Sequence, residues 1–446
     1  MIQQDKYIKH YTDNFKIFEE NLNGQKNGHI HDLRKAAILY LQDCGFPTTH
    51  EEEWRFTNID PLLAQLFSVT STEKQVKLQK KDIEHLLYKD WSGLQLVFVD
   101  GIYKPDLSDL DWNQSGIIMS SLNAIHGPDQ DVLLETFAGY ETFKQNAFSA
   151  LNTAFIRDGV VLKLEKNIIA EEPIHLLHIA TENDKGQLIN PRNLIYLSEG
   201  SQAILVESHL CLGSGKYFNN PVTEIRLNEN AHLNHIRLQN ESENAYHIGS
   251  VFVDQKQNSN YTSTSMSFGA KISRHNTYTK LGGQGIETIL NGLYMGHGDQ
   301  LVDNNTFIDH LQPHCESHEL FRGVLSDNAH GVFSGKIMVH PDAQKTDAKQ
   351  SNNCLLLSDN AQINSKPQLE IYADDVRCTH GATVGQLDEE GIFYLRSRGI
   401  SEQQAKNILT YAFAEQVIEG IEIEAVRDYV DLIILSRLKE DMNFIK

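Results

Sequence analysis

The sequence predicts a mainly β fold, in which a long repetitive β core is flanked by helical segments at both ends of the chain. Short runs rich in Val, Ile, Leu, Thr and Tyr alternate with polar turns from about residue 160 to residue 375, and no helix-length periodic segment interrupts them. One polar turn recurs within this region. Amphipathic helical patterns precede and follow it, so stacked β coils between helical ends are the favoured interpretation.

The recurring turn combines a polar residue, an acidic residue, Gly or Asn, and a small residue. It occurs as Ser198–Ser201, Asn228–Ala231, Ser326–Ala329 and Ser358–Ala361. Gly and Asn tolerate the left-handed backbone that a tight turn needs, so we expect this conformation at the third position. A period of about 30 residues is typical of solenoid coils. A parallel β-helix fits it, because each coil buries its side chains against the next, and a β-sandwich remains the alternative.

The first part of the chain is mixed but mostly helical in pattern. An apolar stripe predicts a helix over His31–Cys44, which Gly45 and Pro47 would end. Leu94–Asp100, followed by glycine, is typical of one strand of a hairpin. A second helix is predicted over Glu135–Ile156. We therefore assign residues 1–145 to a mostly helical N-terminal domain and residues 146–390 to the β core.

Residues 391–446 are predicted to form a C-terminal helical hairpin. Ser401 and Gln404 form a capping box, with Ser at the cap and Gln three residues later. The first helix of the hairpin presents one apolar face, and a second amphipathic run follows it. A partner could cover the apolar side chains of that face, which include Ala405, Ile408, Leu409, Ala412 and Phe413.

Composition excludes several classes of protein. The net charge of −21 over 446 residues argues against a general nucleic-acid binder. No run approaches the ~18 apolar residues needed to span a membrane, and the N-terminus lacks the apolar core of a signal peptide, so we expect a cytoplasmic protein. Five cysteines without a CxxC pair do not form a disulfide framework or a four-thiolate site. No phosphate-binding GxxxxGK[ST] loop and no GxSxG motif are present, so nucleotide hydrolysis by the chain itself is not indicated.

Cys378 and His380 form the one C-x-H pair of the chain. On a strand, residues two apart project from the same face, which would bring a soft ligand and a borderline ligand together. Structural zinc sites need about four ligands, so the missing ones would come from elsewhere in the chain or from another subunit. A buried thiol beside a hydrogen-bonded imidazole is the equally weighted alternative.

A second group of candidate ligands lies in the segment Asp303–His318. His310, His314 and Cys315 are the weaker metal candidates, and His318 completes an even spacing of histidines that would share one face of a strand. Pro313 argues against a helix through them, and the pattern is not HExxH. A polar, hydrogen-bonded ladder is the favoured interpretation of these histidines, and metal ligation is the alternative.

With these residues described, the chain resembles the SufB/SufD family of iron–sulfur cluster assembly proteins, and is most similar to its SufD members. The motifs that carry the resemblance occur in the order of the family and span nearly the whole chain. They are Glu52–Asn58, Glu172–His175, Asp309–Cys315, Leu320–Gly323, Phe333–Ile337, Cys378–Gly385 and Phe393–Ile400.

The resemblance implies a right-handed parallel β-helix with helical domains at both ends, and a non-catalytic scaffold subunit that works with SufB and the SufC ATPase. It implies that the C-terminal hairpin docks SufC and that the end of the β-helix meets SufB. A nascent iron–sulfur cluster, or iron, would bind transiently at that junction rather than as a permanent cofactor. The family's contributing histidine matches His380, with Cys378 as the less certain partner, and the isolated chain could form a homodimer.

Two positions favour SufD over SufB within the family. Alignment on Leu355–Asp359 places Asn352 where SufB has a functional cysteine, and Gly381 stands where SufB has a glutamate. Cys354 lies two residues from the first of these positions, so its role stays open. A β-helix enzyme acting on polysaccharides is the alternative class of function, and co-purification with an ATPase subunit against polysaccharide turnover would discriminate the two.

Overall fold

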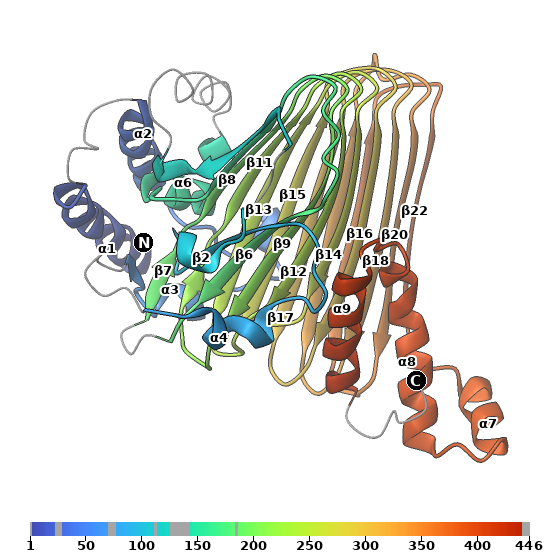
Figure 1. The fold of residues 1–446 in the computed structure, drawn as a ribbon. Helices are drawn as coiled ribbons and strands as arrows, with labels where there is room; N and C mark the ends of the chain where they lie inside the picture. The colour runs from blue at the N-terminus through green and yellow to red at the C-terminus, as the bar shows by residue number, and fades with distance from the viewer. Residues whose placement is uncertain are drawn as a thin grey trace.

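The protein is described here by a computed structural model, which covers residues 2–22, 29–69, 77–110, 114–124, 142–182 and 186–438. Its centre is a solenoid in which the chain alternates between two parallel sheets, so that each coil adds one strand to each sheet (Figure 1). This arrangement confirms the parallel β-helix and excludes the β-sandwich, whose sheets would be antiparallel.

The two sheets contain, within the described residues, twelve and ten strands. Sheet A runs from the C-terminal edge through β21 (Gln362–Ile371), β19 (His330–Val339), β17 (Leu301–His310), β15 (Ile272–Leu281), β13 (Tyr246–Gln255), β11 (Val222–Leu227), β8 (Arg192–Leu197), β5 (Val160–Leu164) and β4 (Ile117–Ser121), with β1 (Ser68–Val69), β7 (Gln187–Ile189) and β10 (Phe218–Asn219) beside it. Sheet B runs through β22 (Arg377–Gly385), β20 (Asp347–Leu356), β18 (Glu316–Leu325), β16 (Glu287–Gly296), β14 (Asn260–Ser267), β12 (His232–Asn240), β9 (Gln202–Cys211), β6 (Ile174–Ala180), β2 (Leu94–Val99) and β3 (Ile102–Tyr103).

Antiparallel pairing occurs at the N-terminal end of the solenoid. β2 pairs with β3 and β4 pairs with β5 in antiparallel register, whereas every coil after them is parallel. The β2–β3 turn places Asp100 and Gly101 at φ values of 51° and 76°, which is the left-handed geometry of a two-residue hairpin. The hairpin predicted at Leu94–Asp100 is therefore confirmed.

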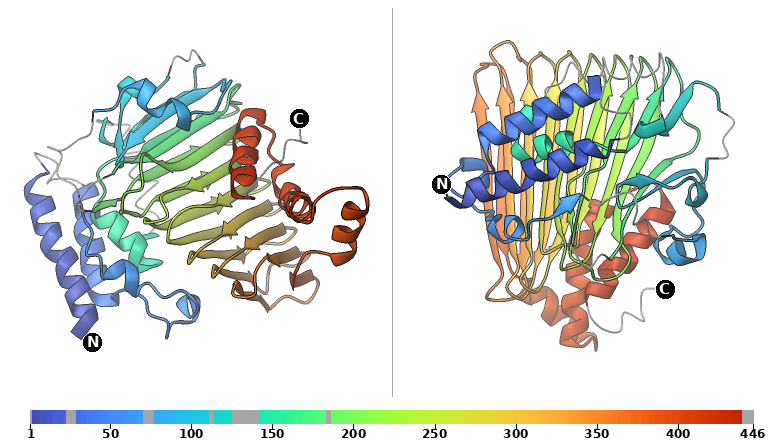
Figure 2. Two further views of the ribbon diagram at one scale, coloured as in Figure 1. Left: turned by 90° about the horizontal axis from the view of Figure 1, so that it is seen from below. Right: turned by 90° about the vertical axis from the view of Figure 1, so that its left-hand side faces the viewer.

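Helices lie on the outer faces of the two sheets (Figure 2). The N-terminal helices α1 (Ile2–Glu20), α2 (His29–Cys44) and α6 (Ala147–Ala154) pack through one apolar cluster against β13 and β15 of sheet A. The C-terminal helices α8 (Glu402–Ile418) and α9 (Glu424–Arg437) pack against β9, β12 and β16 of sheet B. The other α-helices of the described residues are α3 (Asp60–Leu63), α4 (Lys80–Ile83) and α7 (Glu389–Ser397).

Two predicted helix boundaries agree with the structure, and the helix predicted over Glu135–Ile156 agrees only in part. α2 ends at Cys44, and Gly45 follows with a φ of 69°. The capping box at the start of α8 is present, since Ser401 accepts from the Gln404 amide and the Gln404 side chain accepts from Ser401. Of the helix predicted at Glu135–Ile156, residues 135–141 lie outside the described residues, and α6 occupies part of the remainder.

The recurring turn adopts the expected left-handed backbone only in part. Gly200 and Asn230, at the third position, have φ values of 68° and 58°. In the turn Ser326–Ala329 the left-handed residue is instead Asp327, at the second position. Asn328 there serves another purpose: it donates to Asp299 of one neighbouring turn and accepts from Asn360 of the next. Asparagine in this turn therefore also ties adjacent coils together.

The interior of the solenoid is apolar on one side and polar on the other. Alternate residues of the strands build one apolar cluster along the whole length. Farther along the same strands the interior carries buried charged groups, where Glu207 accepts from His209 at 2.8 Å and from His235 at 3.2 Å. Burial lowers the pKa of His178 to about 3 and that of His247 to about 4, so both imidazoles are neutral at pH 7.

Candidate functional site

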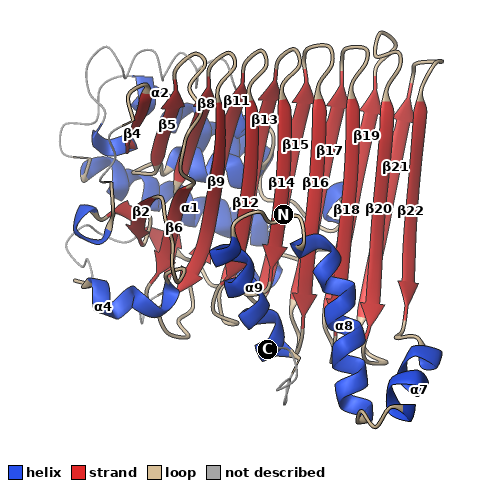
Figure 3. Cartoon of the chain, turned by 45° about the vertical axis from the view of Figure 1, so that its right-hand side comes forward, coloured by secondary structure: helices blue, strands red, loops and turns tan. Residues whose placement is uncertain are grey.

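Cys378 and His380 lie on β22, the last strand of sheet B. β22 occupies the free edge of the sheet (Figure 3), and within the described residues it pairs only with β20. β21 occupies the corresponding edge of sheet A. The final coil of the solenoid is therefore uncovered, and one row of backbone N–H and C=O groups on each edge strand has no ladder partner there.

The register of β22 shows which way the pair faces. Cys378 lies opposite Ala348 and His380 lies opposite Gln350, and both of these β20 residues are buried in the interior of the solenoid. Cys378 and His380 therefore project over the open end of the interior, on one face, as their spacing predicts. Cys378 is half-buried against the apolar cluster and burial raises the pKa of its thiol, whereas His380 is exposed.

In the register of His380, the next two strands of sheet B each place one buried polar side chain in the interior. Gln350 on β20 donates through Nε2 to Oε2 of Glu319 on β18. Glu319 is 3% exposed, and burial raises its pKa to about 7. Gly335 on β19 makes room for the amide, because a Cβ at that position would lie 2.2 Å from Gln350 Nε2. Sequence reasoning missed Glu319 and Gln350, whereas Gly335 belongs to the motif Phe333–Ile337.

Cys354 and Asn352 lie farther along β20 and face the interior. Cys354 is 2% exposed, and burial raises the pKa of its thiol to about 12, so it is a protonated thiol at neutral pH. The Asn352 amide accepts from the Tyr294 hydroxyl at 3.0 Å and donates to Ser365 at 3.1 Å. Asn352 therefore joins three strands of the last coils.

The histidine-rich segment does not form one strand, and the expectation of histidines sharing one strand face is wrong. His310 ends β17, His314 lies in the following turn with a φ of 60°, and His318 belongs to β18. His310 is fully buried and pairs with Ser317 at 2.9 Å, and burial lowers its pKa to about 4. His314 is exposed, and Cys315 packs in the apolar cluster.

A metal centre is not preformed in this part of the solenoid. Throughout the described ranges, no three His, Cys, Asp or Glu side chains are arranged so that they could hold one ion. Cys378 and His380 thus supply at most two ligands from this chain, and His310, His314 and Cys315 do not converge on a common point. Any complete coordination sphere at the open end needs groups from outside the described chain.

The apolar stripe predicted on α8 is partly covered by the solenoid. Ala405 is buried, and Phe413 lies under the Arg322 guanidinium at 4.4 Å while its carbonyl accepts from the same arginine. Leu409 lies beside the start of α7, where a Cβ at Gly391 would be 3.3 Å from Leu409 Cδ1. Leu409 is half-buried, like Ile408. Of the five residues predicted as a docking face, only Ala412 is exposed.

In the described part of residues 391–446, the most exposed aromatic side chains lie on α7. Phe393 is 74% exposed and Tyr394 is 57% exposed, and the Arg398 guanidinium lies 5.2 Å from the Tyr394 ring. The aromatic and basic run at Phe393–Ile400 was among the motifs of the family resemblance. Two exposed aromatic rings on one short helix form a surface that a partner could cover.

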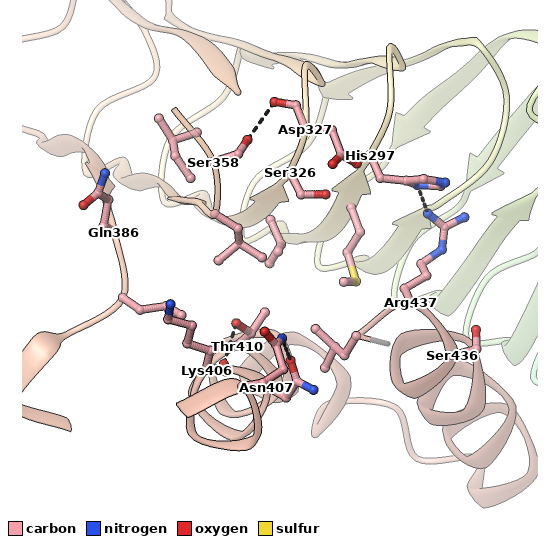
Figure 4. Close-up of a pocket in the computed structure, with 18 of the residues that line it drawn as sticks. His297, Ser326, Asp327, Ser358, Gln386, Lys406, Asn407, Thr410, Ser436 and Arg437 are labelled. Carbon is pink, nitrogen blue, oxygen red and sulfur yellow. Dashed lines mark hydrogen bonds between the residues drawn. The ribbon is translucent and has the colours of Figure 1, made fainter. Parts of the chain in front are cut away.

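A cavity of about 720 Å³ separates these helices from the solenoid. Strand ends and turns of sheet B and α9 line it with both apolar and polar side chains, while Lys406, Asn407 and Thr410 enter from α8 (Figure 4). At one side Arg437 donates to His297 at 2.9 Å, and His297 pairs with Glu243 at 2.7 Å. The helices therefore contact the solenoid around a hollow rather than along a continuous packed seam.

The motif Glu52–Asn58 lies against the outer face of sheet A. Trp54 is buried under the guanidinium of Arg274, whose centre is 3.9 Å from the ring. The same arginine forms an ion pair with Asp303, which also accepts from the Thr57 hydroxyl at 2.6 Å. This motif therefore anchors the N-terminal region to β15 and β17.

Comparison with known families identifies the chain's relatives. The model of the SufBD protein N-terminal region matches residues 1–176, and the model of the SufBD core domain of SUF-system FeS cluster assembly matches residues 178–413. The chain belongs to the SufBD family. The SufBD core domain thus begins within β6 and ends within α8, and it contains the open end, Cys378 and His380.

Individual SufBD relatives align over most of their length. An iron–sulfur cluster assembly SufBD family protein of Synechocystis is 32% identical over 91% of this chain and 90% of that protein. The iron–sulfur cluster assembly protein SufD of Escherichia coli is 33% identical over 88% of this chain and 89% of its own. SufD of Bacillus subtilis is 25% identical over 93% of this chain. These similarities confirm the resemblance drawn from the motifs. In the described part of this SufBD chain, no helix is long and apolar enough to cross a membrane.

Proposed function

We propose that this SufBD-family chain is a SufD-like scaffold subunit that forms a nascent iron–sulfur cluster site together with a SufB partner and engages the SufC ATPase. The observation that carries the proposal is the position of Cys378 and His380 at the uncovered end of the solenoid. Imidazole and thiolate are ligands that iron accepts. The cluster is the cargo of the assembly rather than a resident cofactor of this chain.

The open end supports a heterologous partner for two reasons. Two ligands do not complete a coordination sphere, so the partner supplies the others. The edge strands β21 and β22 offer unpaired backbone groups, which a second solenoid can extend by strand addition. The site then exists only in the complex, and cluster formation depends on both subunits. A second copy of this chain could occupy the same edges when SufB is absent.

The experiment that tests the site is cluster reconstitution on the purified complex with His380→Ala. Because His380 is exposed and no group in the described residues hydrogen-bonds to its ring, the substitution leaves the thermal unfolding midpoint and the complex yield unchanged. Cluster formed per intact complex falls at least tenfold.

His314→Ala is the matched control, since His314 is an exposed histidine of the same solenoid in a turn distant in sequence. It should leave the cluster yield unchanged. A yield from His380→Ala equal to wild type would remove His380 from the site. A fall in both variants would mean that exposed histidines act non-specifically.

The ATPase dock is assigned to the C-terminal helices. On α7 and α8, apolar side chains that remain open to a partner include Phe393, Tyr394 and Ala412 and the half-buried Ile408 and Leu409. Ala405 and Phe413 support this surface from beneath rather than contact SufC. The chain itself is proposed to be non-catalytic, because it has no phosphate-binding glycine loop. ATP hydrolysis by the pure, SufC-free chain would contradict this.

A further inference from the structure

A single polar column connects the interior of the solenoid to His380. Glu319, Gln350 and His380 occupy the same register on the neighbouring strands β18, β20 and β22, which Figure 3 shows side by side. In a parallel sheet such residues stack at about 4.8 Å intervals on one face. Glu319 is the innermost of the three and His380 is the outermost.

The amide of Gln350 is hydrogen-bonded through its nitrogen and unsatisfied at its oxygen. Its Nε2 donates to Glu319, which leaves the amide oxygen as the free end of the side chain. Gln350 is 2% exposed, and Oε1 has no hydrogen-bond partner within the described chain although it is fully buried. A buried acceptor without a donor costs about 1–3 kcal/mol, so such groups usually have a function.

The donor that this oxygen lacks is available one coil above. His380 is the register partner of Gln350, and its imidazole has a ring N–H that meets no acceptor among the described residues. A histidine that binds a metal through one nitrogen almost always donates its other N–H to a carboxylate or carbonyl, which fixes the tautomer and the ring orientation. A glutamine carbonyl can serve this purpose.

We propose that Gln350 is a positioning residue for His380: its amide oxygen accepts the imidazole N–H when a partner covers the open end, and Glu319 holds the amide in that orientation. The inference rests on the proposed function of His380. It assigns the tautomer of the histidine, and hence which ring nitrogen faces the nascent cluster, to two residues buried beneath the site.

Glycine at position 335 is the second observation that fits a positioned amide. A Cβ there would lie 2.2 Å from Nε2 and 2.8 Å from Cδ of Gln350, so the amide occupies space that any other residue would fill. The amide is thereby confined between β19 and Glu319 rather than free to rotate. Confinement of this kind lowers the entropic cost of orienting the ring above it.

The test is a double-mutant cycle on the purified complex with Gln350→Met and His380→Ala, in which cluster formed per intact complex is measured. Methionine is similar in volume to glutamine and removes the amide. Loss of such a supporting partner costs about 10–100-fold, so Gln350→Met lowers the yield at least tenfold in the wild-type background. In the His380→Ala background it has no further effect, because the histidine that it positions is gone.

Asn352→Leu is the matched control. Asn352 is a buried amide on the same face of β20, but it lies opposite Ala382 and bonds to Tyr294 and Ser365. Its loss lowers stability, and any effect of Asn352→Leu should be the same in the wild-type and the His380→Ala backgrounds.

Glu319→Gln keeps an oxygen that accepts from the Gln350 amide, and it should retain the yield. Gln350→Asn, which withdraws the amide by one methylene, is the second variant if Gln350→Met does not fold, and it carries the same expectation.

The outcomes separate this inference from the proposed function. A low yield from His380→Ala with an unchanged yield from Gln350→Met overturns the positioning role and leaves the His380 site standing. A wild-type yield from His380→Ala overturns the site itself. Equal fold-losses from Gln350→Met in both backgrounds would show a structural role only, which also overturns the inference.

Discussion

At the scale of single residues, burial decides what each titratable group can do. The solenoid encloses the thiols of Cys315 and Cys354 and the imidazole of His310. Burial raises the pKa of both thiols and lowers the pKa of the imidazole, which favours the neutral form of each group. His380 is exposed and Cys378 is only half-buried, so these two remain accessible to an external ligand. Residue type alone does not separate the two groups, whereas position in the coil does.

Glu319→Gln should change how stability depends on pH. Burial raises the pKa of Glu319 from 4.5 to about 7, so the folded carboxyl holds its proton more tightly than the unfolded one. Its contribution to the free energy of unfolding is fully present below pH 4.5 and is lost as pH rises to 7, a change of about 3 kcal/mol. Glutamine does not titrate, so the Glu319→Gln variant does not lose this free energy of unfolding as pH rises. Denaturant unfolding from pH 4.5 to pH 8 should therefore show the variant gaining on wild type, and parallel pH profiles would contradict the assignment.

At the scale of elements, the C-terminal helices combine attachment with exposure. Arg322 fixes α8 to β18 by bonding to the Phe413 carbonyl and covering its ring, and it forms a further bond to Gln416. α7 makes fewer contacts with the solenoid and presents Phe393 and Tyr394 to solvent. A helix that is held by its neighbour α8 while its aromatic rings stay exposed is suited to bind a partner.

A double substitution of Phe393 and Tyr394 to alanine should weaken SufC binding without unfolding the chain. Buried aromatic anchors commonly contribute 2 kcal/mol or more to an interface, which corresponds to a loss of about thirtyfold in affinity. Both rings are mostly exposed in the free chain, so the thermal midpoint should stay unchanged. Titration calorimetry with SufC measures the loss.

Leu432→Ala on α9 is the control for this surface, because Leu432 is 67% exposed but lies on another helix of the same region. It should bind SufC as wild type does. Undiminished SufC binding by the double variant, or by a folded chain truncated after Gly399, would move the dock to another part of the molecule.

At the scale of the whole molecule, the coil period made the fold predictable and also limits what the sequence reveals. Turns repeating at about 30 residues predicted the solenoid, and Glu319, Gln350 and His380 follow the same interval, so the column could have been found by stacking the coils. Two features could not be predicted. The left-handed turn at His314 ends the strand that the even spacing of the histidines assumed. Arg322 covers Phe413, which is 91 residues away in the sequence. Both depend on tertiary contacts that no local pattern contains.

The two ends of the solenoid differ, and this difference predicts how the chain associates. The N-terminal end finishes in the short antiparallel strands β3 and β4, while the long parallel strands β21 and β22 form the other end and leave it open. Val384 on β22 is 52% exposed and faces the end of the interior above Cys354. Val384→Lys places a charge on this edge, which opposes strand addition. We expect any homodimer of the isolated chain, and its complex with SufB, to weaken at least tenfold by analytical ultracentrifugation.

Val384→Thr is the control, because threonine keeps the β-branched shape and adds no charge. It should associate as wild type does, and both variants should keep the thermal midpoint, since the side chain lies at the rim rather than within the packed interior. Binding to SufC should also survive in Val384→Lys, because α7 and α8 lie outside the edge strand. If the lysine variant still forms both assemblies with wild-type affinity, the open end is not the surface through which this chain meets its solenoid partner, and a cluster site shared across that end would have no physical basis.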